Sequence, residues 1–256
     1  MRQVSAVVRA MAIVDLVAGS RDPLRIAAIA ATVGVPRNTC YELVSTLSEG
    51  GALTVSESGL VSAGPRLLVW GNAYAQTVDL VAEGRAIALE TSLETDATVH
   101  IARLEGADVV YLVKEEGSLQ IRMGSAVGRR VPAHATGVGK AILGSLPRSE
   151  VDVFLDTHPL HRLTPTTITD RAVFLAELGR VSATGIAFDH EESSPDVCCV
   201  ASPVRDEHGS VVAGFSISTL ASRMTPQVEA RFADAAIRGA GRLSERLGYS
   251  SERRPG

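Results

Sequence analysis

The chain has 256 residues, a formal net charge of −4 and an apolar fraction of 45%, which is ordinary for a protein with a buried core. No apolar run reaches the roughly 18 residues needed to cross a bilayer, and the N-terminus lacks the pattern of a signal peptide. Three cysteines are too few for a disulfide framework. We therefore expect a soluble, cytoplasmic protein that makes no membrane contact.

The first 64 residues are predicted to form a winged helix-turn-helix domain. Apolar residues recur every three or four positions in three segments, and a polar turn separates two short strands. The three helices and two strands are expected at residues 6–19, 25–33, 36–50, 52–55 and 60–62. Gly34 interrupts the pattern between the second and third helices, as in a helix-turn-helix.

The third predicted helix has one apolar face and one polar face, and the polar face is the candidate surface for the DNA major groove. The residues expected to contact DNA from this face are Arg37, Asn38, Thr39, Tyr41 and Ser45. The wing at residues 56–59 and Arg2 are expected to reach the DNA backbone or the minor groove.

The charge of this first domain gives DNA binding no support. Five arginines balance five acidic residues within residues 1–64, so a basic footprint is missing. A head that binds a protein partner instead of DNA therefore stays an alternative.

A linking helix is predicted at residues 65–79, followed by a second domain at 80–248 and a disordered tail at 249–256. The linking helix carries the only tryptophan, and its apolar content predicts packing against another surface, such as a second subunit. Strands of the second domain are expected at 98–104, 109–114, 119–123, 186–189, 197–205 and 211–218, and helices at 80–93, 139–145, 148–156, 171–184 and 226–247. Residues 124–138 are expected to be irregular. Because hairpins outnumber crossovers, we expect an α+β fold whose sheet is mostly antiparallel.

The segment Ala135-Thr136-Gly137-Val138-Gly139-Lys140 matches a phosphate-binding loop only in part. The first glycine of that loop and the hydroxyl residue after its lysine are missing, and Ile142 replaces the third glycine of a dinucleotide fingerprint. No nucleotide or other cofactor is therefore expected. The glycine-rich turn either binds a small carboxylate with its backbone amides or packs closely against the sheet.

Acid, imidazole and thiol groups occur together in residues 188–199. Their spacing does not match a metal site, so no metal is expected. A catalytic Cys199 would need a base such as His190 or His134, which leaves an enzyme as the alternative function, and no catalytic residue is assigned.

Three polar residues of the predicted strands are candidates for ligand binding. Asp189, at a strand end, can hold a ligand hydroxyl or tie down a loop. Ser216 and Ser218 alternate with apolar residues, so both hydroxyls share one face of the sheet, where they bind a ligand or a neighbouring strand.

Several longer motifs follow one another in a recognisable order. They are residues 24–34, Pro36-Arg-Asn-Thr-Cys-Tyr-Glu-Leu, Gly128-Arg-Arg-Val-Pro-Ala-His-Ala-Thr-Gly-Val-Gly-Lys, Leu163-Thr-Pro-Thr-Thr-Ile-Thr-Asp, Gly185-Ile-Ala-Phe-Asp-His-Glu-Glu and Cys199-Val-Ala-Ser-Pro-Val-Arg-Asp. In this order they resemble the IclR family of bacterial transcriptional regulators, from about residue 4 to residue 247.

The resemblance implies a winged head that dimerises on a near-palindromic operator, followed by a GAF-like effector-binding domain. It implies control of catabolic genes by a small organic acid or aromatic metabolite, with a carboxylate as the expected effector and a homodimer or homotetramer as the assembly. The implied effector contacts are Ile121, Met123, Gly137, Val138, Asp189, Cys199, Ser216 and Ser218. The chain departs from the family at Glu42, where an arginine is usual, and around Ser194-Pro195, where a glycine is usual.

Overall fold

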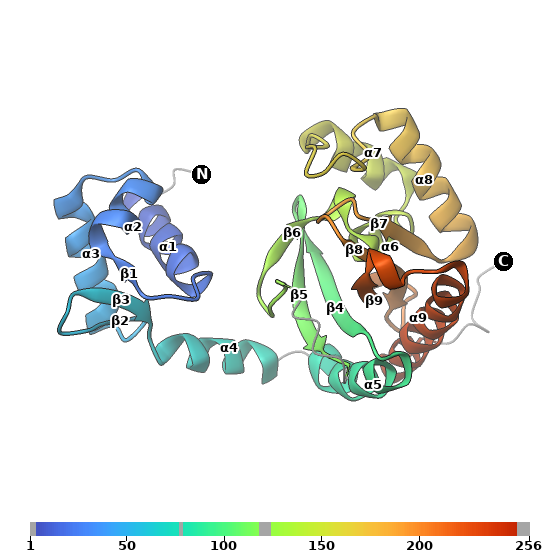
Figure 1. Cartoon of the computed structure of the whole chain (residues 1–256), viewed down its shortest axis with the longest axis horizontal. Coiled ribbons are helices and arrows are strands. Elements are labelled where there is room, and N and C mark those ends of the chain that lie inside the picture. Colours follow the sequence, from blue (N-terminus) through green and yellow to red (C-terminus); the bar gives the residue numbers. More distant parts are fainter. Residues whose placement is uncertain (1–3, 77–78, 118–123, 250–256) are drawn as a thin grey trace. The chain divides into compact units, whose positions relative to one another are not determined.

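The computed structural model describes residues 4–76, 79–117 and 124–249 (Figure 1). The chain divides into two compact units, Met1–Val78 and Asp79–Gly256. Within the described ranges, every helix is either too short or too polar to cross a membrane.

The first unit is a winged helix-turn-helix domain, as predicted. Its elements are α1 (Ser5–Ala18), β1 (Leu24–Arg25), α2 (Ile26–Val33), α3 (Arg37–Glu49), β2 (Leu53–Val55), β3 (Leu60–Ala63) and α4 (Arg66–Gln76). The strands form an antiparallel sheet in the order β1-β3-β2. β1 was not expected from the sequence, because a two-residue strand exists only through its pairing with β3.

The core of this unit fixes the orientation of α3. Cys40 and Val44 of α3 pack with Ile13 of α1 and Ile29 of α2, and all four are at most 1% exposed. Gly34 ends α2 in the left-handed conformation, with φ of +71°, which glycine adopts without steric cost. The polar face of α3 is therefore left at the surface.

The second unit contains a six-stranded sheet whose strand pairings are all antiparallel, in agreement with the prediction. Its strands are β4 (Thr98–Glu105), β5 (Asp108–Glu115), β6 (Arg130–Pro132), β7 (Ala187–His190), β8 (Val197–Arg205) and β9 (Val211–Leu220), in the order β6-β5-β4-β9-β8-β7. Its helices are α5 (Asp79–Thr95), α6 (Gly137–Leu143), α7 (Arg148–Thr157), α8 (Arg171–Thr184) and α9 (Pro226–Arg246), with short 3₁₀ turns at Ala133–Ala135 and Ala221–Arg223.

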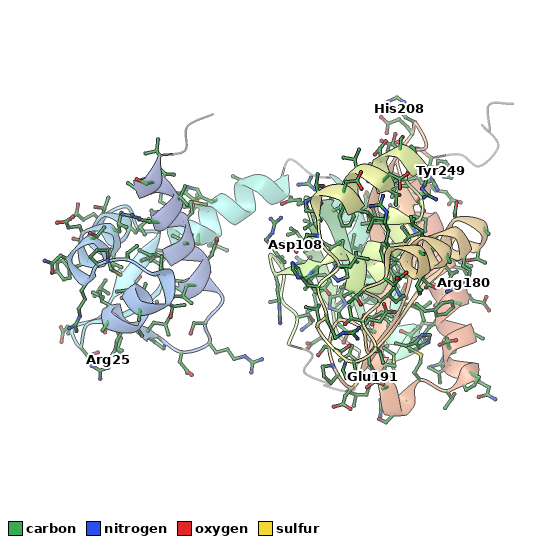
Figure 2. The ribbon with its side chains drawn as sticks, turned by 90° about the horizontal axis from the view of Figure 1, so that it is seen from above. Arg25, Asp108, Arg180, Glu191, His208 and Tyr249 are labelled. Atoms are coloured by element: carbon green, nitrogen blue, oxygen red, sulfur yellow. The ribbon has the colours of Figure 1, made fainter. Side chains whose placement is uncertain are left out.

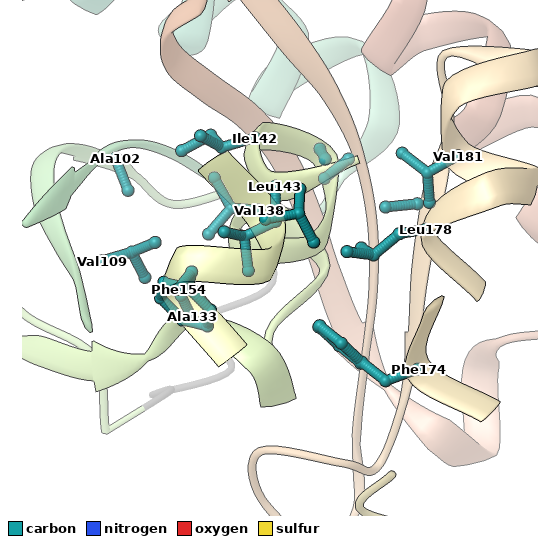
Figure 3. Packing of buried hydrophobic residues seen from close by; sticks show 14 residues of the cluster. Ala102, Val109, Ala133, Val138, Ile142, Leu143, Phe154, Phe174, Leu178 and Val181 are labelled. Carbon is teal, nitrogen blue, oxygen red and sulfur yellow. The ribbon is translucent and has the colours of Figure 1, made fainter. Parts of the chain in front are cut away.

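The two faces of this sheet carry different helices (Figure 1). On the α9 face, α5 and α9 approach the sheet closely: a Cβ at Gly239 would lie 2.6 Å from the Phe215 ring. On the α6 face, a Cβ at Gly214 would lie 2.5 Å from Val138, so α6 rests directly on β9. Ile142 and Leu143 of α6 belong to an apolar cluster that also contains residues of α7 and α8 (Figure 3).

Three ion pairs join α5 to α9 across the surface. Glu83 pairs with Arg246, Glu90 with Arg242 and Glu94 with Arg238, at 3.8, 2.7 and 2.5 Å. Because the numbers rise along α5 as they fall along α9, the two helices are antiparallel.

The prediction that residues 124–138 are irregular is wrong in its second half. Arg130–Pro132 form the edge strand β6, and α6 begins at Gly137, two residues earlier than expected. The Thr136 hydroxyl caps this helix by accepting a hydrogen bond from Gly139 N at 3.1 Å. The predicted strand at 119–123 and residues 250–256 of the predicted tail lie outside the described residues.

Candidate functional site

The polar face of α3 is the first candidate site, and it is open to solvent. The residues predicted to contact DNA are exposed at Arg37, Asn38 and Tyr41 and half-buried at Thr39 and Ser45. α3 thus presents a row of hydrogen-bonding side chains on a helix whose other face is held by the core.

The wing between β2 and β3 is a short turn that closes on itself. Ser56 Oγ accepts a hydrogen bond from Leu60 N at 3.1 Å and lies 2.9 Å from Ser58 Oγ. Gly59 adopts a φ of +74°. Arg2, the other residue expected to reach DNA from outside α3, lies outside the described residues.

The second candidate site is a cavity of about 120 Å³ on the α6 face of the six-stranded sheet. Its sheet residues are His100, Tyr111, Val131, Val197, Cys199 and Ser218. Its other residues are Gly124, Ser125, Arg129, Ser193 and Ser194. This volume is somewhat smaller than the roughly 150 Å³ of an apolar cavity that binds benzene, so the site matches a ligand of about one small ring at most.

Neutral hydrogen-bonding groups form the floor of the cavity. Ser125 Oγ lies 2.8 Å from His100 Nε2, and Ser218 Oγ lies 3.5 Å from His100 Nδ1 and 3.1 Å from Cys199 Sγ. Burial, together with the charge of Lys114, lowers the pKa of His100 to about 3. The imidazole is therefore uncharged near neutral pH, and it can both donate and accept hydrogen bonds.

Tyr111 and Cys199 are also kept uncharged. The Tyr111 ring lies 4.6 Å from the His100 ring, and burial is the main cause that raises the Tyr111 pKa. Burial, followed by the nearby charge of Asp189, raises the pKa of the Cys199 thiol well above its ordinary value. The floor therefore suits the uncharged part of a ligand.

Asp189 lies beside this floor, directly paired with Cys199 between β7 and β8, and is fully buried. Its carboxylate accepts hydrogen bonds from Glu192 N at 2.7 Å and from Ser193 Oγ at 2.9 Å. Burial raises its pKa, against the opposing effect of these hydrogen bonds. Asp189 thus ties down the loop at residues 191–196, which contributes Ser193 and Ser194 to the cavity.

The 191–196 loop, which begins at Glu191 (labelled in Figure 2), has a strained backbone and is held by several hydrogen bonds. Glu191 and Asp196 have φ of +61° and +62°, a conformation that costs side chains other than glycine about 1 kcal/mol or more. Hydroxyls of the threonine-rich segment 164–167 donate to the carbonyl oxygens of Glu191 and Glu192 at 2.7–2.8 Å. The left-handed residues of the loop therefore flank Ser194-Pro195, where the sequence indicated a missing glycine.

A buried lysine, Lys140, also holds the 191–196 loop in place. Lys140 of α6 is 1% exposed, and its Nζ lies 2.5 Å from Glu192 Oε1 and 3.6 Å from Glu177 of α8. Burial raises the pKa of Glu192, although the charge of Lys140 opposes this effect. Glu192 Oε2 is buried and has no hydrogen-bond partner among the described residues. Lys140 thus connects the cavity loop to α6 and α8.

Arg129 supplies a positive charge to the cavity wall. Its guanidinium donates to Gly124 O, and the residue as a whole is exposed. The charge of the nearby Lys114 is already used within the protein, because its Nζ donates to Ser125 O at 2.9 Å and pairs with Glu116 at 2.7 Å. Among the described lining residues, Arg129 is therefore the group best suited to an anion.

The predicted effector contacts fall into three groups. Cys199 and Ser218 line the cavity. The second group, Asp189, Ser216, Gly137 and Val138, lies close to the cavity without lining it, and Asp189 is the neighbour of Cys199 in the sheet. Ser216 is buried beside His100 in the sheet, and Gly137 and Val138 form the first turn of α6, which packs on β8 and β9. The last two predicted contacts, Ile121 and Met123, lie outside the described residues.

His100, Tyr111 and Arg129 were missed by sequence reasoning. The alternation of His100 with Val99 and Ile101 could have placed its side chain on the polar face of β4. Tyr111 shares that face only because of a bulge at Leu112 of β5, opposite Ile101 and Ala102, which the sequence pattern alone does not reveal.

Neither histidine proposed as the base for a catalytic Cys199 lies beside its thiol. His190 contacts Glu229 and pairs with Cys198, on the face opposite Cys199, while His134 lies 2.9 Å from His161 O. Among the described residues, Ser218 Oγ links the cavity imidazole, His100, to Cys199, at 3.5 Å from His100 Nδ1 and 3.1 Å from Cys199 Sγ. Within the described ranges, no cluster of three or more potential metal ligands is found.

Comparison with known proteins matches both units to one family. Residues 72–245 match the model of the bacterial transcriptional regulator IclR C-terminal domain, and residues 6–57 match the IclR helix-turn-helix domain. The chain is 32% identical to the HTH-type transcriptional regulator XynR of Escherichia coli over 96% of this chain and 98% of XynR. It is 35% identical to the transcriptional repressor AllR of Klebsiella pneumoniae over 86% of this chain and 82% of AllR.

Solved structures agree with this match. The IclR structure from Thermotoga maritima superposes with a TM-score of 0.78 at 28% identity, covering 96% of this chain and all of that one. The PobR inducer-binding domain from Acinetobacter, solved as a double mutant in complex with 3-hydroxybenzoic acid, has a TM-score of 0.59 at 28% identity, covering 62% of this chain and 94% of that one.

Proposed function

The chain belongs to the IclR family of bacterial transcriptional regulators, and from this premise we propose which residues bind its operator and its effector. It is a regulator rather than an enzyme, with a head for operator DNA and a C-terminal domain for a small ligand. We place it in the cytoplasm, because it must reach DNA.

We propose that α3 enters the major groove with Arg37, Asn38, Thr39, Tyr41 and Ser45 toward the bases, while Arg2 and the wing contact the backbone or minor groove. The observation that supports this assignment is the exposed polar face of α3 on a helix fixed by a buried opposite face.

Substitution in α3 tests this assignment. The double variant Thr39→Ala/Tyr41→Ala should bind DNA upstream of its own gene at least tenfold more weakly in a gel shift. Val153→Ala, on the exposed side of α7, serves as the control and should bind as the wild type does. Unchanged binding by the double variant would refute α3 as the readout helix.

We propose that the cavity holds a small organic acid, with its carboxylate at Arg129 and its uncharged part on the floor formed by His100, Ser218 and Cys199. Asp189 and Ser216 flank this floor within the sheet, Gly137 and Val138 pack on the same face in the first turn of α6, and Ile121 and Met123 stay proposed contacts. The 3-hydroxybenzoic acid bound by the PobR domain supports a ligand of this size and charge.

Paired ligands test the position of the carboxylate. Benzoate, 3-hydroxybenzoate and short aliphatic acids are compared with their amides by thermal shift and by release from DNA. Arg129→Gln should weaken binding of an active acid about tenfold and leave the amide unaffected. Arg130→Gln, whose arginine is instead paired with Glu105 and Asp108, is the matched control. Equal losses for acid and amide would move the carboxylate away from Arg129.

We propose that the head dimerises through apolar side chains at its surface. On α4, Leu68, Val69 and Trp70 are 68%, 63% and 51% exposed, and α1 exposes Val7 and Met11 at 58% and 56%. Apolar groups at this density favour burial against a second copy. A dimer or a tetramer of such dimers fits this surface, and sedimentation of Trp70→Glu, expected to dissociate the heads, tests it.

A further inference from the structure

Glu42 lies at the crest of α3, which is the centre of the helix face that points away from the core. Successive residues of an α-helix lie about 100° apart around its axis. Cys40 and Val44, the two fully buried residues of α3, therefore point about 40° apart, and Glu42 lies about 180° from the midpoint between them. Glu42 is thus the residue of α3 that points most directly away from the core.

The Glu42 side chain is available for a contact. The residue is exposed, and within the described part of the chain its carboxylate takes part in no hydrogen bond or ion pair, while its backbone oxygen accepts from Thr46 Oγ1 at 2.9 Å. Glu49, two turns further along the same face, differs because Ser45 Oγ donates to its carboxylate at 3.4 Å.

The position of Glu42 matches the floor of the major groove. α3 begins at Arg37, so Glu42 lies in its second turn, within the part of a readout helix that contacts base edges. A residue at the crest of such a helix points most directly at the bases, whereas a short acidic side chain on a flank would lie nearer the phosphates, which repel it.

An ionised carboxylate can only accept hydrogen bonds, and the donors on the groove floor are the amino groups of cytosine and adenine. Of these two, cytosine N4 is the usual partner of glutamate. Resting on the proposed use of α3 for readout, we propose that Glu42 reads a cytosine in each half of the operator through its N4 amino group.

Because the head is nearly neutral, the Glu42 contact contributes a larger share of operator recognition than it would in a basic head. Residues 1–64 carry five arginines and five acids, so attraction to the phosphates is weak whatever the sequence. A carboxylate in the groove lowers that attraction further, and its hydrogen bond is regained only on the correct base.

Selection from a random duplex library with the full-length protein tests the proposal. The wild type should select a motif with one cytosine per half-site that it prefers roughly tenfold over thymine. Glu42→Ala should lose the preference at that position alone and bind random DNA more tightly. Glu42→Gln should change the preferred base to adenine, because glutamine pairs with adenine N6 and N7. Glu49→Gln, the matched control, should select the wild-type motif.

Two results would overturn the proposal, and they differ in what else they overturn. If Glu42→Ala and Glu42→Gln both select the wild-type motif with the same cytosine preference, Glu42 reads no base, although α3 can still be the readout helix. If the wild type itself selects no motif, the proposed use of α3 also fails. Melting curves of each variant establish that it is folded.

Discussion

The two faces of the six-stranded sheet are built from the same strands but hold different chemistry. On β9, Phe215 and Ile217 point to the α9 face and are fully buried among apolar side chains. Ser216 and Ser218, the residues between and after them, point to the α6 face beside His100. The α9 face resembles the interior of any stable domain, whereas the α6 face buries a lysine, an aspartate and a histidine.

This difference separates stability from specificity. Apolar burial stabilises the fold without regard to partner, while buried polar groups are costly unless each one is hydrogen-bonded. The cavity opens on the α6 face, where the polar groups are buried, next to the strained 191–196 loop. Substitutions on the α9 face should therefore change stability alone, and those on the α6 face should also change ligand binding or pH dependence.

The largest expected effect is on the α9 face. Phe215→Ala should lower the free energy of unfolding by about 4 kcal/mol, because it leaves a cavity against α9. Urea denaturation measures this loss, and Phe215→Leu, which keeps most of the volume, should lose much less. If Phe215→Ala also altered ligand affinity in the still folded protein, the separation of the two faces would be broken.

A somewhat smaller effect is expected at Lys140. Lys140→Met should lower the free energy of unfolding by about 3 kcal/mol, because it leaves the carboxyl groups of Glu192 and Glu177 buried without their cation. Adding Glu192→Gln should restore part of the loss, which a double-mutant cycle from urea denaturation would show as a favourable coupling. Strictly additive losses would mean that the ion pair does not hold the cavity loop.

The smallest effect concerns pH and His100. Because the folded pKa of His100 lies below its ordinary value of 6.5, the unfolded chain takes up a proton first as the pH falls. The stability that neutral His100 contributes above pH 6.5 is thus lost progressively between about pH 6.5 and pH 3, by roughly 2 kcal/mol at pH 4.5.

The His100→Gln variant isolates this contribution. Asp189, on the same face, has a raised pKa, so the stability that its carboxyl contributes to the fold decreases as the pH rises. This effect is opposite in direction to that of His100. Wild type and His100→Gln share the contribution of Asp189, and the difference between their unfolding free energies at pH 6.5 and pH 4.5 belongs to His100. If the unfolding free energy of His100→Gln changed with pH as steeply as that of the wild type, a buried neutral imidazole would be contradicted.

Sequence reasoning predicted the elements best where local signals were complete. The helix Arg171–Thr184 was placed at its observed bounds, since Asp170 caps its first turn and Gly185 ends it in the left-handed conformation. β6 was missed because it contains Pro132 and exists only through its pairing with β5. Periodicity reports on the burial of a segment, but not on a pairing with a distant strand.

The cavity was predictable only in part for the same reason. The alternation of residues along β9 put Ser218 on a polar face, and the family resemblance named Cys199. Which residues of β4 and β5 share that face depends on the strand order β5-β4-β9-β8 and on a bulge in β5, and neither can be inferred from the sequence of one segment alone. The position of Arg129 depends in addition on the segment that leads into β6.

The ion pairs between α5 and α9 bear on how this architecture can be rearranged. Since the helices are antiparallel and Glu83 meets Arg246, the second unit begins and ends at neighbouring points. A domain whose ends meet can be circularly permuted, or inserted into a loop of another protein, without breaking its sheet. The effector domain is therefore suited to transplantation as a ligand-sensing module, and a permutant opened at the 206–210 turn between β8 and β9 should keep its cavity.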